Sequence, residues 1–303
     1  MTTHRPARPD RERAGLRHPT VQRLRRLSRR RSARTDEGAY VVDGPVLLAE
    51  ALDAGVPLQE VVAEPGADAA LLARAAAAGV AVLEVADGVL AKALDVVQPQ
   101  AVAAVARREL PTPDALVERA VADLRPVVVL VGLQDPGNAG TLVRTAEAAG
   151  ASGVVLTTGS VDVTNPKCVR ATAGSLFRVP VAEGAGPDAL LDLLDGHGIG
   201  IWALAGGPSA GGPVPVDRPV ALLVGSEAHG LAPSMLARCR GTVSIPMEGR
   251  VESLNAGVAG SVVLFDLARR RREEEAGAAP PVPSGAQEPS GGPGRPVGHN
   301  DRP

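Results

Sequence analysis

The chain has very few aromatic side chains. Its 303 residues include one Trp, one Tyr and two Phe, so the hydrophobic core must be built from aliphatic residues. The hydrophobic content of 45% is ordinary for a globular protein and supplies a core of sufficient size. RNA-binding modules that stack several bases on aromatic rings are disfavoured, because they need more rings than this chain offers.

Cysteine and long apolar runs are scarce as well. Cys168 and Cys239 form neither a disulfide framework nor a C-x-x-C metal motif, which favours a reducing cytoplasm and predicts no metal site. No apolar run approaches the ~20 residues that span a bilayer, so we expect no membrane partner. The N-terminus is charged but lacks the apolar segment of a secretory signal, with an organellar transit peptide as the alternative.

Lysine is nearly absent, and the arginines are unevenly distributed. Lys92 and Lys167 are the two lysines among 32 basic residues. Residues 1–34 carry twelve Arg against two acids, whereas the remainder is acidic enough to bring the net charge to −2. A basic arm on an acidic body favours a polyanionic partner such as a nucleic acid, with a solvated tail as the alternative.

The hydrophobic pattern predicts two α/β domains between disordered ends. A basic helix is expected over 19–33, because Val21, Leu24 and Leu27 recur at helical spacing. Two prolines within three residues disfavour regular structure after the first domain. The predicted segments are a disordered basic arm at 1–18, an α/β domain at 19–107, a linker at 108–125, a second α/β domain at 126–272 and a disordered tail at 273–303.

Longer Val- and Leu-rich strands alternate with helices in the second domain, which predicts a mostly parallel sheet. Strands are expected at 127–133, 153–158, 178–183, 199–205, 220–225 and 242–246. Helices are expected at 139–149, 187–195, 231–238 and 253–271.

Three of these strands run into loops rich in Gly, Asn, Ser and Glu, within residues 126–140, 220–230 and 242–255. Ligands of open α/β sheets lie beyond the carboxyl ends of the strands. The sequence therefore predicts one polar site built from three loops.

The first loop leads into a helix that Asn138 or Thr141 is predicted to cap. Arg144 lies about one turn further on the face of the loop, which favours a ligand-binding or catalytic role over a surface salt bridge. The loop has no P-loop Lys-Ser/Thr and the chain has no G-x-G-x-x-G, so nucleoside triphosphates and dinucleotides are disfavoured.

The second and third loops add further polar candidates. Glu227 follows a strand end between Gly225 and Gly230, which let the backbone approach a ligand, and capping a helix is its alternative role. His229 is a less favoured base, because it is flanked by glycine and expected to be exposed. In the third loop, Ser253 is the predicted N-cap and Asn255 the amide that reaches out of the first turn.

These residues resemble the three motifs of the SpoU (TrmH-like) RNA 2′-O-ribose methyltransferases of the SPOUT superfamily. The matching segments are Asn138-Ala-Gly-Thr-Leu-Val-Arg144, Gly225-Ser-Glu-x-x-Gly230 and Ile245-Pro-Met through Ser253-Leu-Asn255. Residues 165–180 are similar to the family's segment between the first and second motifs. Residues 19–106 resemble the ribosomal-protein-like substrate-binding domain that often precedes it.

The resemblance implies a trefoil-knot α/β domain that binds S-adenosylmethionine and acts as a homodimer on RNA. Gly225, Ile245 and Leu254 would contact the cofactor through the backbone. Arg144 would act at the ribose 2′-hydroxyl, which Asn138, Glu227, Ser253 and Asn255 would help to fix. RNA contacts are expected from Arg23, Arg26, Arg30, Lys167 and Arg170.

The resemblance leaves the substrate open. Large-subunit ribosomal RNA is the first candidate and tRNA the second, and a housekeeping role or antibiotic resistance are both compatible with the motifs. A catalytically silent RNA-binding protein on the same fold is the main alternative. A dinucleotide-dependent oxidoreductase is disfavoured by the missing glycine fingerprint.

Overall fold

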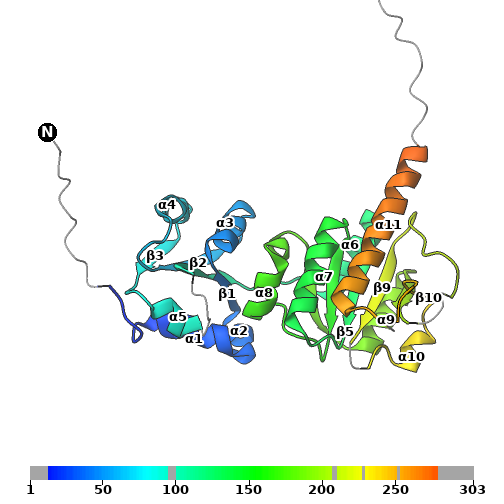
Figure 1. The fold of residues 1–303 in the computed structure, drawn as a ribbon, viewed down its shortest axis with the longest axis horizontal. Helices are drawn as coiled ribbons and strands as arrows, with labels where there is room; N and C mark the ends of the chain where they lie inside the picture. The colour runs from blue at the N-terminus through cyan, green and yellow to red at the C-terminus, as the bar shows by residue number, and fades with distance from the viewer. Residues whose placement is uncertain (1–12, 95–99, 207–209, 227–228, 251–252, 279–303) are drawn as a thin grey trace, which may run out of the picture.

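The computed structural model describes residues 13–94, 100–206, 210–226, 229–250 and 253–278. Two α/β domains lie side by side, with the N-terminal domain in blue and cyan and the C-terminal domain in green to orange (Figure 1). The predicted disorder of residues 1–12 and 279–303 falls outside the described residues.

The N-terminal domain is a four-stranded sheet with helices on both sides. The strands lie in the order β1-β4-β2-β3, with β4 antiparallel to β1 and β2. Its elements are α1 (Pro19–Arg29), α2 (Arg31–Glu37), β1 (Ala39–Asp43), α3 (Pro45–Asp53), β2 (Leu58–Ala63), α4 (Ala69–Ala77), β3 (Ala81–Glu84), α5 (Val89–Leu94) and β4 (Val102–Arg107).

The basic N-terminal segment is more ordered than predicted. Helix α1 buries Val21, Leu24 and Leu27 as expected, but the predicted helix over 19–33 breaks at Arg30, whose backbone is extended. Ala14 pairs with the end of β3, since its N–H donates to the Glu84 carbonyl at 3.1 Å. The prediction of a disordered arm is therefore wrong for residues 13–18.

The expected linker at 108–125 contains helix α6 (Pro113–Asp123). Thr112 caps this helix by accepting a hydrogen bond from the Ala115 N–H at 3.2 Å. Pro113 occupies the first turn, where its missing N–H has no cost. The two prolines thus start a helix, and the part of the prediction that covers α6 is wrong; we propose that the domain boundary lies at 108–112.

The C-terminal domain is a six-stranded, fully parallel sheet in the order β10-β8-β9-β5-β6-β7. Each predicted strand overlaps an observed one, which confirms the mostly parallel sheet. The remaining elements are β5 (Val127–Val131), α7 (Pro136–Ala148), β6 (Gly153–Thr157), α8 (Pro166–Thr172), the 3-10 helix η1 (Ser175–Phe177), β7 (Val181–Ala185), α9 (Pro187–Gly196), β8 (Gly200–Leu204), β9 (Val220–Gly225), α10 (Pro233–Leu236), β10 (Gly241–Val243) and α11 (Ala256–Ala278).

Alternate residues of the central strands bury themselves on opposite faces of this sheet. Val128 and Leu130 pack with α7 and α11, whereas Val127 and Val129 pack with α6 and α9. Both faces are covered, which explains the continuous apolar runs of these strands. Among the described helices, none is long and apolar enough to cross a membrane.

Helix α7 is held closely between two other helices. A Cβ on Gly140 would lie 2.4 Å from Ala171 Cβ of α8, and a Cβ on Gly260 of α11 would lie 2.4 Å from Leu142 Cδ2. These two glycines allow α8 and α11 to pack directly against α7.

Strand β10 is enclosed by the chain that leaves its neighbour. β8 pairs with one side of β10, and Ala210, in the loop that follows β8, forms an antiparallel bridge with Thr242 on β10. The chain then returns to the centre of the domain, where α11 packs on α7. Helix α11 continues to Ala278, so residues 273–278 are helical and not part of a disordered tail.

Candidate functional site

A cavity of about 500 Å³ lies at the carboxyl ends of β8, β9 and β10. All three predicted cofactor residues line it: Gly225, Ile245 and Leu254. Ser253 and Asn255, predicted to act near the reacting groups, lie on its wall as well. The cavity is therefore where the second and third loops meet, as the sheet topology requires.

The sequence argument missed part of the wall. Leu204, Ala205 and Gly206 line the cavity at the end of β8, and Leu236 of α10 lies opposite. The first three follow an apolar strand and end in glycine, which is the signal that marked the other loops. The same signal could have added the end of β8 to the predicted site.

A tight turn shapes the second loop. The Gly230 N–H donates to the Ser226 carbonyl at 2.8 Å, and a Cβ on Gly225 would lie only 2.5 Å from the Gly230 carbonyl carbon. Position 225 therefore accepts no side chain without a shift of the turn. His229 is exposed, as expected, whereas Glu227 lies outside the described residues.

Both predicted helix caps are displaced. Asp135 caps α7 by accepting from the Asn138 N–H at 2.7 Å, in place of Asn138 or Thr141. Asn255 caps α11 by accepting from the Val258 N–H at 3.2 Å, in place of Ser253. Helix α7 begins earlier than predicted because Pro136 suits its first turn, and α11 begins later.

The first and third loops meet at the start of these two helices. A Cβ on Gly257 would lie 3.1 Å from Asn138 Oδ1 and 3.2 Å from Asn255 Oδ1. The two amides therefore converge over a residue without a side chain. Loops from distant parts of the sequence become one site at this contact.

Arg144 is exposed on α7 and does not line the cavity. Its guanidinium has no carboxylate partner among the described residues, so no salt bridge within that part of the chain accounts for it. It projects from the same helix as Asn138, two turns further along.

The predicted RNA-binding residues fall into two groups. Arg23 and Arg26 both pair with Glu37, at 2.9 and 2.7 Å, and Arg170 pairs with Asp43 at 3.0 Å. Burial acts to raise the pKa of Glu37, but the hydrogen bonds from Arg23 and Arg26 lower it overall. These arginines have structural partners.

Arg30 and Lys167 form the second group. Both are exposed and have no acidic partner among the described residues. They are therefore the predicted RNA contacts whose charge is available to a ligand.

Other catalytic chemistries find little support in the described part of the chain. Its His, Cys, Asp and Glu residues form no group of three that could hold a metal ion. Burial, together with the nearby carboxylates Asp162, Glu183 and Asp135, raises the pKa of Cys168 to about 12. A thiol with this pKa stays protonated near neutral pH and is a poor nucleophile.

Comparisons with known proteins agree with this site. Residues 125–265 match the SpoU rRNA methylase family, and residues 18–104 match the MRM3-like substrate-binding domain. The 23S rRNA (guanosine(2553)-2′-O)-methyltransferase RlmP of Bacillus subtilis is 29% identical over 77% of this chain and 90% of its own. A tRNA/rRNA methyltransferase of Mycobacterium tuberculosis (strain ATCC 25618 / H37Rv) is 35% identical over 84% of this chain and 81% of its own.

Solved structures give the same assignment. The AdoMet-bound rRNA methyltransferase from Sinorhizobium meliloti is 31% identical, with a TM-score of 0.73 over 84% of this chain and 96% of that one. The SpoU methyltransferase AviRb from Streptomyces viridochromogenes, in complex with AdoMet, is 26% identical, with a TM-score of 0.74 over 84% and 100%. From the family match and these relatives, the chain belongs to the SpoU family of S-adenosylmethionine-dependent RNA methyltransferases.

Proposed function

We propose that this protein methylates a ribose 2′-hydroxyl of RNA, with large-subunit ribosomal RNA as the first candidate substrate and tRNA as the second. The observation that carries the proposal is the convergence of the second and third motif loops on one cavity at the carboxyl edge of the parallel sheet, with the first loop meeting the third at Gly257. The relative in Bacillus subtilis is named for 2′-O-methylation of 23S rRNA, which supports this choice of substrate. We place the reaction in the cytoplasm, in keeping with two free thiols in the chain.

The cavity suits S-adenosylmethionine in size and lining. Its volume of about 500 Å³ is within the range of small-molecule sites, roughly 300–1,000 Å³. Leu204, Val224 and Ile245 offer an apolar wall for the adenine, while Ser226 and Ser244 offer polar groups for the sugar and amino acid. When bound, the cofactor supplies an electrophilic methyl group on a sulfonium with a good leaving group.

The protein's contribution is alignment and charge. Holding the two reactants in line contributes about 7–11 kcal/mol in well-oriented systems. Asn138 and Asn255 converge at the α7–α11 contact, where they would hold the ribose. Ser253 and Glu227 complete this proposed set.

Arg144 is assigned to the acceptor side of the reaction. An arginine side chain offers hydrogen-bond donors and no acceptor, so Arg144 is unsuited to be the base. It would instead bind the phosphate next to the acceptor ribose and stabilise the alkoxide as the proton leaves. Arg144 is exposed and has no acidic partner among the described residues, which suits a group that binds an anionic ligand.

The carboxyl edge of the sheet also carries the available cations. Arg31 of α2 donates to the Ser160 carbonyl at 3.3 Å, in the loop that follows β6. β6 is two strands from β9, and neighbouring strands lie about 4.8 Å apart, so roughly 10 Å separate this loop from the cavity strands. Arg30 precedes Arg31 in the chain and Lys167 lies in α8, which follows this loop, and we assign both to the RNA backbone.

A homodimer is proposed through α11. Val258, Val262 and Phe265 are 48%, 46% and 48% exposed, and their spacing places them on one face of the helix. A contiguous apolar stripe beside the site suits a second copy of the chain, as the family resemblance implies.

Gly225→Ala should weaken S-adenosylmethionine binding, because the new Cβ displaces the Gly225–Gly230 turn. We expect the dissociation constant from calorimetry to rise about tenfold or more, which is ~1.4 kcal/mol. Gly206→Ala is the matched control, since it lines the same cavity with no atom within 4 Å of its added Cβ. Unchanged affinity in Gly225→Ala, with native fluorescence from the buried Trp202, would exclude this site.

Arg144→Ala should abolish most turnover while cofactor and RNA affinities persist. Loss of one charge-stabilising donor typically lowers the rate on the order of 10²–10³-fold. Single-turnover methylation of a ribosomal RNA fragment measures it, with Arg119→Ala on the exposed face of α6 as control. A near-normal rate in Arg144→Ala would reject the role, and no transfer by wild type would favour the silent RNA-binding alternative.

The double variant Arg30→Gln/Lys167→Gln should reduce the salt dependence of RNA binding. On single-stranded RNA each lost phosphate contact lowers the slope by ~0.7, so the pair should lower it by about 1.4. Arg74→Gln, an exposed arginine paired with Asp53, should leave the slope unchanged. Equal slopes for wild type and the double variant would place the RNA elsewhere.

Val262→Asp should convert the dimer to a monomer in sedimentation velocity, because it places a carboxylate in the proposed apolar interface. Val121→Asp, on an exposed position of α6, is the matched control and should remain dimeric. A wild-type protein that sediments as a monomer at micromolar concentration contradicts the proposed dimer.

A further inference from the structure

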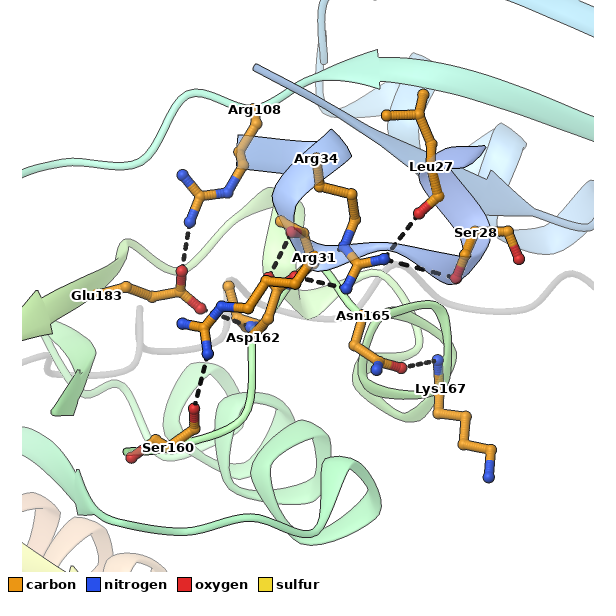
Figure 2. A network of polar contacts seen from close by, with 12 residues as sticks. Leu27, Ser28, Arg31, Arg34, Arg108, Ser160, Asp162, Asn165, Lys167 and Glu183 are labelled. Carbon is orange, nitrogen blue, oxygen red and sulfur yellow. Dashed lines mark hydrogen bonds and ion pairs between the residues drawn. The ribbon is translucent and has the colours of Figure 1, made fainter. Parts of the chain in front are cut away.

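One ion pair at the domain junction is fully buried (Figure 2). Arg34 of α2 donates from Nε and Nη2 to Asp162 Oδ2, each at 2.7 Å, and the two side chains are 3% and 5% exposed. The other described ion pairs at the junction leave their arginines partly exposed: Arg178, paired with Glu50, is 41% exposed, and Arg108, paired with Glu183, is 21% exposed.

The remaining polar atoms of this pair are also bonded. Arg34 Nη1 donates to the Leu27 carbonyl at 2.7 Å, and Asp162 Oδ1 accepts from the Thr164 N–H at 2.8 Å. A buried ion pair with complete hydrogen bonding tolerates little change in geometry, because any shift leaves a charge unpaired in a dry site. The pair therefore fixes one orientation of α2 on the loop between β6 and α8.

This loop is tied to the start of α7. Ser160 Oγ donates to the Leu130 carbonyl at 3.0 Å, and the Val161 N–H donates to the Leu133 carbonyl at 2.8 Å. Two residues further on, Asp135 caps α7. Hydrogen bonds, linked by two short stretches of chain, thus join the N-terminal domain to the helix that carries Asn138 and Arg144.

Helix α8 provides a second connection to the same place. It follows Asp162 in the chain and packs on α7, where a Cβ on Gly140 would lie 2.7 Å from the Cys168 carbonyl oxygen. There is no space for α8 to approach α7 more closely. The position of α2 is thereby transmitted to α7 through the loop and through α8.

We infer that Arg34 and Asp162 are positioning residues for methyl transfer. They hold the RNA-binding domain at one distance and angle from α7. The acceptor ribose is thereby placed correctly relative to Arg144 and the cofactor cavity. The inference rests on the proposed function. A misplacement of about 1 Å in such a site can lower the rate about 10²-fold, whereas affinity for RNA depends on charges that remain in place.

The test uses the full chain with Cys239→Ser, which leaves Cys168 as its one thiol. Single-turnover rate, RNA affinity, S-adenosylmethionine affinity and the rate of Cys168 alkylation are compared across four proteins. These are the parent, Arg34→Met, Arg34→Met/Asp162→Leu, and Arg178→Gln as the exposed junction control.

In Arg34→Met we expect a rate about 10²-fold lower, a cofactor dissociation constant within twofold of the parent, and faster alkylation of Cys168 as α8 loosens. The double variant removes the unpaired charge but also the acceptor of the Thr164 N–H, so it should slow alkylation relative to Arg34→Met without fully reaching the parental rate. Its methyl-transfer rate should stay at least tenfold low, since the substituted apolar pair lacks the directional bonds. Arg178→Gln should behave like the parent.

A parental rate in Arg34→Met, or a full recovery of rate in the double variant, would overturn the positioning role and leave the proposed function intact. A loss that appears only as weaker RNA binding would also overturn it. A parent that binds RNA but transfers no methyl group would overturn the proposed function and this inference together.

Discussion

The structure depends on how closely α7 is packed by its two neighbours. Gly140 admits the backbone of α8 on one flank, and Gly257 and Gly260 admit α11 on the other. The contact with α11 brings the third motif to the first. The contact with α8 links α7 to the surface on which the N-terminal domain docks. Side chains at these positions would separate elements whose contact creates the site.

The arginines of this chain fall into two groups, those that pair with a carboxylate of the folded protein and those that do not. Arg23 pairs with Glu37 within the N-terminal domain, and Arg34 pairs with Asp162 across the domain junction. Arg30 and Arg144 have no such partner among the described residues and remain for a polyanion. Acids of the folded protein therefore neutralise part of the basic N-terminal segment.

Local signals in the sequence predicted some features of the fold and missed others. The motif residues Gly225, Ile245 and Leu254 do line one cavity, because strand ends and glycines are local signals that survive folding. The helix caps were wrong, since Asp135 and Asn255 compete with nearby residues of similar capping propensity and packing decides between them. Helix α6 was missed because its prolines read as a break, although proline also begins helices.

By itself, the sequence determined the α/β class, the order of the parallel strands along the chain and the three polar loops at their ends. These features follow from hydrophobic periodicity and from residues such as glycine, which determine the backbone conformation at their own position. Tertiary structure alone decided which arginines are paired, that Asn138 meets Asn255, and that Arg34 and Asp162 form a dry ion pair across the domains. The physical reason is that burial and pairing depend on residues from 11 to 128 positions apart in the sequence, and no local pattern encodes the distance between them in the fold.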